Sequence, residues 1–475
     1  MSGTAPMPGL PQGLLLAYYG DDFTGSTDTM EVMTFNGLPT VLFVEPPTPE
    51  RLAQFADRRA IGVAGTARSE TPDWMDANLP GIFAQLAGLG APILQYKLCS
   101  TFDSSPTVGS IGRALDIGLK VRPSPWSPII VAAPALRRYQ AFGNLFATVE
   151  GIAYRLDRHP TMSRHPVTPM TEADIRLHLI AQTDEDIGLV DLLDLKAGRG
   201  QARLTALSEA GDRVVLIDVI DDETLVEAGR LLWEMRGNGV FTASSSGLQY
   251  ALTAYWRSRG LIADAPAIAP LPPAERVVAV SGSCSPVTEG QIDWSLEHGF
   301  SGIKLDVFRI LDPASRQAEI GDAVDRSVEA LSAGKSPLVY SAKGPQDESI
   351  ARLAAETRRR GGDAAAAQSA IGSALGDVLG AVLRKGGLKR AIVAGGDTSG
   401  RATAALGVYA LEAAVPIAPG SPLCFAATDD PAFDGLEIAL KGGQVGGPDY
   451  FAQVRSGGAP LTTPTTTAIN GRSRP

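Results

Sequence analysis

Short apolar runs alternate with longer amphipathic stretches through most of the chain. In the first half these runs are Leu14–Tyr19, Thr40–Val44, Ile93–Tyr96, Pro128–Ala133 and Arg213–Val219. Nearly continuous hydrophobicity over so few residues predicts strands that are buried on both faces. Because helical patterns separate these strands, we expect βαβ units and a mostly parallel sheet.

The alternation stops at Gly260–Pro273, which contains four prolines and several alanines. It then restarts with the runs Arg276–Val280, Pro337–Ser341, Arg390–Ala394 and Leu436–Leu440. We therefore predict two α/β domains, 1–265 and 274–455, each a mostly parallel sheet flanked by helices. Residues 456–475 are rich in Gly, Pro, Thr and Ser, which is typical of a mobile tail.

The composition narrows the class of protein. The formal net charge of −10 argues against a nucleic-acid or membrane partner. No apolar run reaches the roughly 18 residues of a membrane span, and the N-terminus lacks the pattern of a secretory signal. The cysteines Cys99, Cys284 and Cys424 are odd in number and form no CxxC pair. We therefore expect a cytoplasmic enzyme without a disulfide framework.

Open parallel sheets bind ligands beyond the carboxyl ends of their strands, and Asp21 and Asp22 follow the first apolar run. Adjacent carboxylates there could hold a metal ion, orient hydroxyl groups or accept a proton. The alternative is a strand–turn–helix junction, but neither a cap nor a turn needs both residues. We interpret the pair as catalytic, and Asp28 as a residue that stabilises the helix dipole.

A second polar group follows the run that ends at Tyr96. It consists of Lys97, Ser100, Thr101 and Asp103. A lysine supplies charge and the neighbouring hydroxyl and carboxyl groups supply directional hydrogen bonds, a combination that suits a small polyhydroxylated anion. The alternative is a polar loop that ends in a helix cap.

Arg137 and Arg138 follow the next apolar run. A guanidinium matches the oxygens of a carboxylate or phosphate, although paired arginines on a solvated surface are equally common. His165 lies in Ser163–Thr171, which is dense in turn-forming residues. A lone histidine is usually structural, and no Ser or Cys nucleophile is paired with it.

Three clusters of small residues mark strand ends in the second half. They lie in Val280–Thr288, in Ala394–Gly400 before a helix-like stretch over Arg401–Ala414, and in Lys441–Gly447. Such turns cradle phosphates with backbone N–H groups, although helix caps use the same residues. Together they favour a nucleotide pocket. The candidate nucleotide-binding residues are Ser283, Ser285, Gly395, Gly396, Asp397, Thr398, Ser399, Gly443 and Gly446.

Several familiar motifs do not occur in the sequence. It has no GxxxxGK[ST] P-loop, no HExxH, no GxSxG, and no GxGxxG between a strand and a helix. These absences argue against a P-loop ATPase, a zincin, a typical α/β-hydrolase and a typical dinucleotide enzyme.

Six of these segments, taken in their order along the chain, resemble the motifs of the four-carbon acid sugar kinases, an ATP-dependent family with two α/β domains. The resemblance spans about residues 14 to 452. The matching segments are Asp21–Asp22 with Thr24–Gly25, Lys97 with Ser100–Thr101, His165–Met170 (HPVTPM), Gly282–Ser285, Gly395–Gly400 and Lys441–Gly447.

The resemblance implies an active site in a cleft between an N-terminal acid-sugar domain and a C-terminal domain that binds ATP with Mg²⁺. Asp22 or Asp21 would accept a proton from the sugar hydroxyl, typically the terminal one. Lys97 with Arg137 or Arg138 would anchor the carboxylate, and Ser100, Thr101, Asp103 and His165 would complete the sugar site. The resemblance does not identify the metal ligands, and a homodimer is one possible oligomeric state.

The sequence departs from the family pattern at Phe102–Pro106, where many members have a segment with arginine and glycine. Gly20 and Phe23 also stand where other members often have alanine and leucine. The substrate is therefore either a four-carbon acid sugar or oxo-tetronate, or a branched oxo acid such as 3-oxo-isoapionate. Two other classes are a nicotinamide-dependent oxidoreductase and a non-catalytic sugar-acid sensor. The missing fingerprint argues against the first, and the retained phosphate turns argue against the second.

Overall fold

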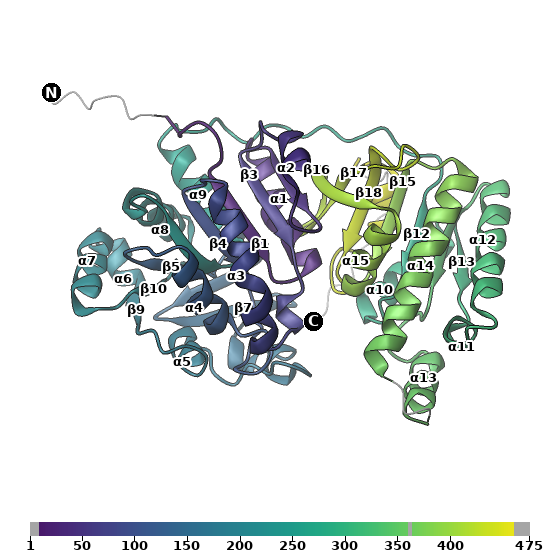
Figure 1. Ribbon diagram of the computed structural model, residues 1–475, viewed down its shortest axis with the longest axis horizontal. Helices are drawn as coiled ribbons and strands as arrows, with labels where there is room; N and C mark the ends of the chain where they lie inside the picture. Colours follow the sequence, from purple (N-terminus) through teal and green to yellow (C-terminus); the bar gives the residue numbers. More distant parts are fainter. Residues whose placement is uncertain (1–8, 360–362, 460–475) are drawn as a thin grey trace, which may run out of the picture.

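The computed structural model describes residues 9–359 and 363–459. Figure 1 shows two α/β halves side by side, with the N-terminal half on the left. The segment between α9 (Gly247–Ser258) and β12 (Val278–Ser281) contains neither a helix nor a strand. Of the predicted tail 456–475, residues from 460 onward lie outside the described part of the chain.

Five parallel strands form the N-terminal part of the main sheet. In spatial order they are β11 (Val240–Ser244), β4 (Ile93–Lys97), β1 (Leu16–Gly20), β3 (Ala60–Ala64) and β2 (Thr40–Phe43). Leu16 and Tyr18 pack toward one helical layer, and Ala17 and Tyr19 pack toward the other. The helices around these strands are α1 (Phe23–Phe35), α2 (Pro49–Ala53), α3 (Pro72–Gly88), α4 (Ile111–Val121) and α9.

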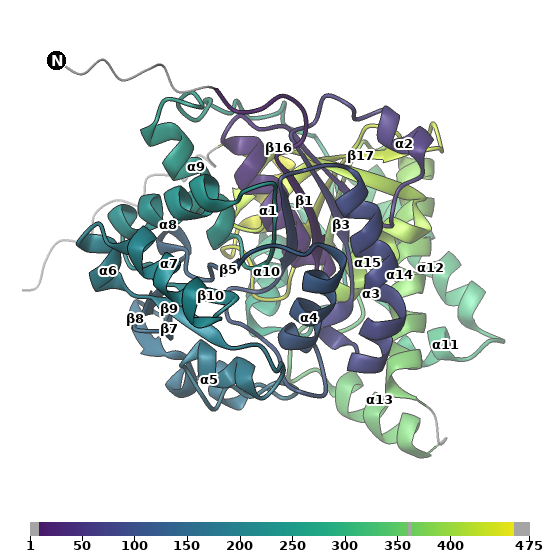
Figure 2. The ribbon, with the colours of Figure 1, turned by 60° about the vertical axis from the view of Figure 1, so that its left-hand side comes forward.

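Two small sheets complete the N-terminal half (Figure 2). One is parallel and contains β5 (Ser127–Ile129), β10 (Val214–Ile217) and β9 (Ile187–Val190). The other is antiparallel and contains β6 (Arg138–Ala141), β7 (Asn144–Val149) and β8 (Ile152–Arg155). The helices of this region are α5 (Ile175–Ile180), α6 (Leu192–Lys196), α7 (Gly200–Ala210) and α8 (Asp222–Met235).

The C-terminal half continues the same sheet. Its strands, in spatial order, are β16 (Val408–Ala418), β17 (Ser421–Thr428), β18 (Leu436–Lys441), β15 (Arg390–Ala394), β12, β14 (Ser336–Tyr340) and β13 (Phe300–Lys304). The last five strands are parallel to one another. The helices are α10 (Pro286–Glu297), α11 (Val307–Leu311), α12 (Arg316–Ser332), α13 (Glu348–Arg359), α14 (Ala364–Gly386), α15 (Gly396–Ala405) and α16 (Tyr450–Arg455).

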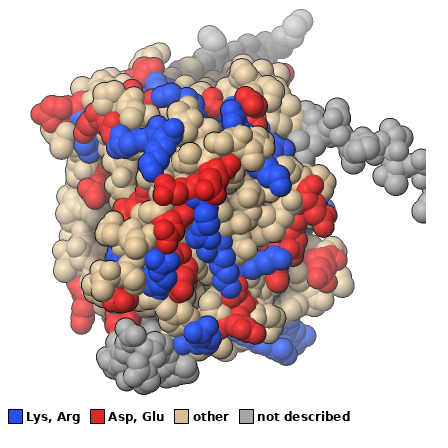
Figure 3. Space-filling view, turned by 90° about the vertical axis from the view of Figure 1, so that its right-hand side faces the viewer, with Lys and Arg blue, Asp and Glu red and all other residues tan. Residues whose placement is uncertain are grey.

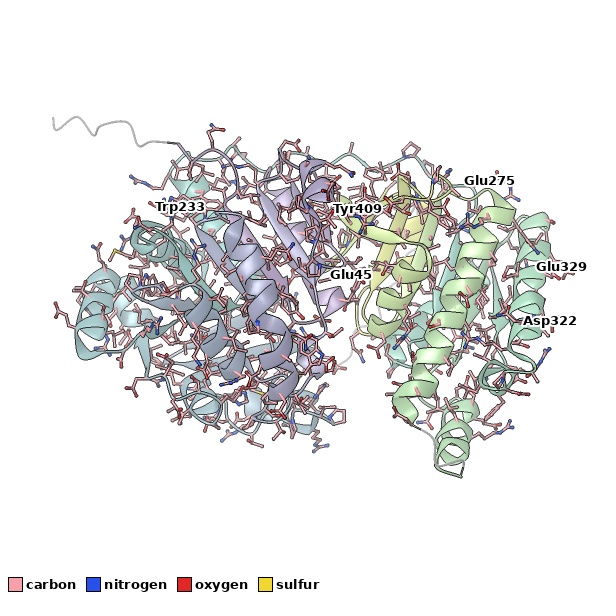
Figure 4. All side chains as sticks on the ribbon, viewed as in Figure 1. Glu45, Trp233, Glu275, Asp322, Glu329 and Tyr409 are labelled. Atoms are coloured by element: carbon pink, nitrogen blue, oxygen red, sulfur yellow. The ribbon has the colours of Figure 1, made fainter. Side chains whose placement is uncertain are left out.

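The two parallel sets join into one sheet of 12 strands, whereas the sequence predicted a sheet for each domain. The join is the antiparallel pairing of β16 with β2, in which Ala410 lies opposite Phe43 and Leu411 opposite Leu42. Tyr409 and Glu45 lie at this junction (Figure 4). The Tyr409 hydroxyl donates to Gln54 Oε1 at 2.8 Å across it. The α/β class with mostly parallel strands is therefore confirmed, with a continuous sheet.

The helix predicted over Arg401–Ala414 is wrong beyond Ala405. Gly407 has a φ of +65° and follows the end of α15, and Val408 then begins β16. The stretch looked helical because its alanines and leucines suit a helix. Pairing with β2 and β17 outweighs that local preference.

Among the described helices, one segment, Ala365–Gly386 of α14, is long and apolar enough to cross a membrane. Half of it is buried inside the molecule and it packs against α12 and α15, as a core helix does. The outer face of this half carries interleaved acidic and basic side chains rather than an apolar surface (Figure 3).

Candidate active site

Arg68 joins the two aspartates at the end of the first strand. It lies in the helical turn η1 (Ala67–Ser69) after β3, with Nη2 2.6 Å from Asp21 Oδ1 and 2.7 Å from Asp22 Oδ1. Burial disfavours its charge, yet the two carboxylates raise the pKa of Arg68 well above its usual value. The aspartates therefore face a permanent positive charge that the sequence analysis missed.

Asp21 and Asp22 differ in their surroundings. Asp21 is 1% exposed, and both of its carboxylate oxygens accept hydrogen bonds from Arg68. Asp22 is partly exposed and caps α1, since Oδ1 accepts the Gly25 N–H at 3.0 Å and Oδ2 accepts the Thr24 hydroxyl at 3.0 Å. Asp22 is thus the more accessible of the two carboxylates.

Lys97 is buried at the end of β4, 2% exposed. Its Nζ lies 3.7 Å from Asp28 Oδ2. Asp28 is in the second turn of α1, beyond the reach of the dipole effect that the sequence analysis assigned to it. The structure corrects that interpretation, because Asp28 is the acidic partner of Lys97.

The loop after β4 folds into a compact polar turn. The Thr101 hydroxyl donates to Asp103 Oδ1 at 2.7 Å and lies 2.9 Å from Cys99 Sγ. Phe102 is fully buried with a φ of +59°, a conformation that costs energy for a bulky residue and concentrates at functional sites. Ser100 is half-buried in the same turn.

The two neighbouring arginines are not equivalent. Arg137 is exposed, with a φ of +55°, whereas Arg138 is half-buried. Burial lowers the pKa of Arg138, and Cys99 and Asp103 partly offset this effect. Within the described residues, Arg138 Nε is a buried donor without a hydrogen-bond partner. An unpaired buried guanidinium nitrogen is a natural partner for a substrate oxygen.

His165 contacts its own turn. Its Nδ1 accepts the Thr168 N–H at 3.1 Å and lies 2.9 Å from the Thr168 hydroxyl. These contacts stabilise the turn, so a role in sugar binding stays a prediction. His159, which the sequence analysis did not single out, is 6% exposed, and burial followed by the charge of Arg138 lowers its pKa.

In the C-terminal half, hydroxyl groups gather at the start of α10. Ser285 caps this helix by accepting the Thr288 N–H at 3.0 Å, and Thr288 donates to Ser283 Oγ at 3.0 Å. Ser285 and Thr288 both hydrogen-bond to the Gly443 carbonyl. The structure therefore brings the first and third predicted nucleotide segments together.

The second segment forms the start of α15. Gly395 has a φ of +121° and donates its N–H to the Lys441 carbonyl at 2.8 Å. The Ser399 hydroxyl donates to the Gly395 carbonyl at 2.8 Å, so Ser399 shapes the turn. A Cβ at Gly282 would clash with Thr398 Oγ1, which shows how closely the two turns approach.

The loop after β18 is held by Gln291. Its Nε2 donates to the carbonyls of Val445, Gly446 and Gly447 at 2.9 to 3.1 Å. Gly446 has a φ of +87°, and a Cβ there would press against the Tyr450 ring. Only glycine fits this bend easily.

A cleft of about 500 Å³ separates the two groups of residues. Asp22 and Arg68 line it from the N-terminal half, and Gly396, Asp397 and Arg401 line it from the C-terminal half. A second cavity of about 180 Å³, with apolar walls that include Ile350 and Ile371, also reaches Asp397. Asp397 therefore lines both the apolar cavity and the cleft that Asp22 lines.

The donor set of the cleft suits a magnesium ion. No group of three or more His, Cys, Asp or Glu side chains that could hold a metal occurs in residues 9–359 and 363–459. Magnesium, however, is usually bound by one or two carboxylates together with substrate phosphates and water. Asp22 and Asp397 supply carboxylates from the two walls.

Comparison with known proteins bears directly on this arrangement. Residues 16–252 match the family model of a sugar-binding N-terminal domain, and residues 278–451 match that of a nucleotide-binding C-terminal domain. The chain is also 54% identical to the 3-oxo-isoapionate kinase of Paraburkholderia graminis, over 94% of this chain and 95% of the relative. The chain belongs to the four-carbon acid sugar kinase family. It is a kinase that uses ATP, as the sequence predicted.

A more distant relative and two solved structures cover almost the same length of the chain. The 3-oxo-tetronate kinase of Pectobacterium atrosepticum is 30% identical, over 93% of this chain and 98% of the relative. A crystal structure from Salmonella typhimurium LT2 is 28% identical with a TM-score of 0.74, covering 92% of this chain and 98% of that chain. Haemophilus influenzae protein HI1011 is 25% identical with a TM-score of 0.69, covering 93% and 100%.

Proposed function

We propose that this kinase transfers the γ-phosphate of ATP to a hydroxyl group, the terminal one, of 3-oxo-isoapionate. The observation that carries this choice is the 54% identity, over nearly the whole chain, to a 3-oxo-isoapionate kinase. The relatives named for 3-oxo-tetronate are only about 30% identical. The branched oxo acid is therefore favoured over the four-carbon acid sugar and oxo-tetronate.

The N-terminal half would supply the groups that bind the acceptor. Arg138, with its free Nε, and Lys97 would bind the carboxylate. Ser100, Thr101, Asp103 and His165 would bind hydroxyl or keto oxygens. Asp22 would accept the proton of the reacting hydroxyl, because it faces the cleft, whereas both oxygens of Asp21 accept from Arg68. Arg137 is exposed and contributes less.

The C-terminal wall would receive the nucleotide. The apolar cavity would hold the adenine ring, and the cleft that Asp397 also lines would hold the phosphates. Backbone N–H groups at the starts of α10 and α15 would bind phosphate oxygens. The candidates Ser283, Ser285, Gly395, Gly396, Thr398, Gly443 and Gly446 all lie in the turns described above, and Ser399 supports the turn from behind.

We also propose that Asp397, together with the ATP phosphates and water, helps to bind Mg²⁺. Bound there, the ion would neutralise charge on the transferring phosphoryl group. Arg68 holds Asp22 in place, and the walls exclude water when they approach each other.

The test is ADP release with ATP and Mg²⁺ across a panel of 3-oxo-isoapionate, 3-oxo-tetronates, threonate and erythronate. We expect the largest kcat/KM with 3-oxo-isoapionate. A higher value with a 3-oxo-tetronate would transfer the assignment to that substrate. ATP binding without release for any acid would contradict the whole substrate class.

Two further expectations concern the whole molecule. Cys99, Cys284 and Cys424 are free, which suits a reducing cytoplasm. Phe142 and Leu177 are 49% and 55% exposed, and a homodimer could cover such side chains. Fractionation of cells and sedimentation of the purified protein test these two proposals.

A further inference from the structure

Lys441, at the end of β18, is a fully buried lysine. Its ammonium donates to Thr288 Oγ1 at 3.0 Å and lies 5.9 Å from the centre of the Tyr450 ring. No carboxylate among the described residues forms an ion pair with it, and burial alone lowers its pKa to about 8. A buried ammonium without an anion is unfavourable, so its position calls for an explanation.

Two helix N-termini lie beside this lysine. The side chain of Lys441 reaches Thr288 in the first turn of α10, and its carbonyl accepts the N–H of Gly395, which begins α15. Helix N-termini carry partial positive charge. The ammonium and the start of α10 therefore lie side by side, and an anion bound there would be stabilised by both.

A chain of hydroxyl groups leads from Lys441 toward the nucleotide cleft. The ammonium donates to Thr288, and Thr288 donates to Ser283 Oγ at 3.0 Å. Ser283 lies between Gly282 and Cys284, which both line the apolar cavity. The Ser283 hydroxyl is therefore linked to the buried ammonium through Thr288.

We propose that Lys441 is a positioning residue of the nucleotide site, whose buried charge is balanced by the phosphates of the bound nucleotide and which aims Ser283 through Thr288. The inference rests on the proposed function. It assigns to Lys441 a task distinct from that of the glycine turn to which it belongs: it sets the affinity for phosphate and the pH range in which the nucleotide binds.

Ionisable groups lie on several of the elements near Lys441. On α10, Asp293 pairs with Lys343, and Glu289 lies against Gly344. Tyr450 on α16 and Cys424 on β17 are buried, and burial raises the pKa of each. Asp397 on α15 lines the cleft.

The negative charge of Glu31 on α1 also raises the pKa values of Tyr450 and Cys424. Burial raises its pKa to about 8, the same range as that of Lys441. Glu31 therefore requires its own control, for which the Glu31→Gln variant serves.

The experiment measures ATP binding by calorimetry at about pH 7, 8 and 9 in buffers of different ionisation enthalpy. An anion favours the charged lysine, so wild-type protein should take up protons on binding ATP above about pH 8, and its affinity should fall as the pH rises. Lys441→Met should bind ATP roughly 10- to 100-fold more weakly, since the buried positive charge that favours the phosphates is lost. Lys441→Arg should restore affinity without the pH dependence, and Glu31→Gln should keep the pH dependence.

The outcomes separate this inference from the proposed function. Failure of wild-type protein to bind ATP at pH 7 would overturn both. ATP binding and turnover without proton uptake, or with Lys441→Met equal to wild type, would overturn only the role of Lys441. If Lys441→Met does not fold, wild-type proton uptake and its loss in Lys441→Arg decide the question.

Discussion

Arg68 and Asp21 form a bidentate ion pair, with Nη2 of Arg68 2.6 Å from Oδ1 of Asp21 and Nε 3.1 Å from Oδ2. Because Asp21 is buried, Arg68→Gln should leave an unpaired carboxylate and destabilise the protein by about 3 to 5 kcal/mol. Urea unfolding measures this change, and adding Asp21→Asn should recover much of it. The exposed pair of Arg51 and Asp429 provides a control, for which Arg51→Gln should cost less than about 1 kcal/mol.

Asp22→Asn should lower kcat by about 100- to 10,000-fold, the usual contribution of a general base. Asparagine caps helices as well as aspartate does, so the fold should be retained. ATP affinity, measured by calorimetry, should stay close to that of wild type. Near wild-type turnover would show that the proton is accepted elsewhere.

Arg138→Gln and Arg137→Gln form a matched pair. The half-buried Arg138 has a free Nε, whereas Arg137 is exposed. Loss of Arg138 should raise KM for the acid by roughly 10- to 100-fold, because a charge-assisted hydrogen bond is lost. Arg137→Gln should change KM by less than about threefold. Equal increases in KM for the acid in the two variants would refute this distinction.

Gly282→Ala should impair the nucleotide site. The added methyl group would clash with Thr398 Oγ1, and such overpacking costs about 1 to 3 kcal/mol. KM for ATP should rise while KM for the acid stays constant. Gly290→Ala, in the exposed part of α10 with open space around it, is the control and should leave both constants unchanged.

Glu31 should make stability depend on pH. Burial raises its pKa from 4.5 to about 8 in the folded state, so the folded protein binds more protons than the unfolded chain between these values. The contribution of Glu31 to the free energy of unfolding therefore falls as the pH rises from about 5 to about 8. The free energy of unfolding in urea should therefore fall more for wild type than for Glu31→Gln as the pH rises through this range. A constant difference between the two proteins would contradict the assignment.

Buried runs of hydrophobic residues were sufficient to predict nine of the 18 strands in the described residues, and with them the position of two polar candidates. The apolar runs ending at Tyr19 and Tyr96 became β1 and β4, and Asp22 and Lys97 stand at or just beyond their ends. The segment Val408–Ala414 was misjudged, because its strand character depends on partners far away in the chain.

Arg68 shows what local pattern reasoning misses. It follows β3, so inspection of that strand end could have identified it, but a single arginine in a turn carries no motif. Its importance comes from two carboxylates 46 and 47 positions earlier, which only the folded sheet brings to it. The side chain of Lys441 was overlooked for a similar reason, since its partner Thr288 lies 153 positions away.

The pairing of β2 with β16 also determines how the cleft can move. Because β2 and β16 share backbone hydrogen bonds, a separation of the two halves would break these bonds, whereas a twist of the common sheet would keep them. The register of β16 with β17 shifts at three places between Val408 and Ala418, where the ladder of hydrogen bonds is interrupted. Such irregularities increase the local twist of a strand, so the strand that joins the two halves is also one along which the direction of the sheet changes.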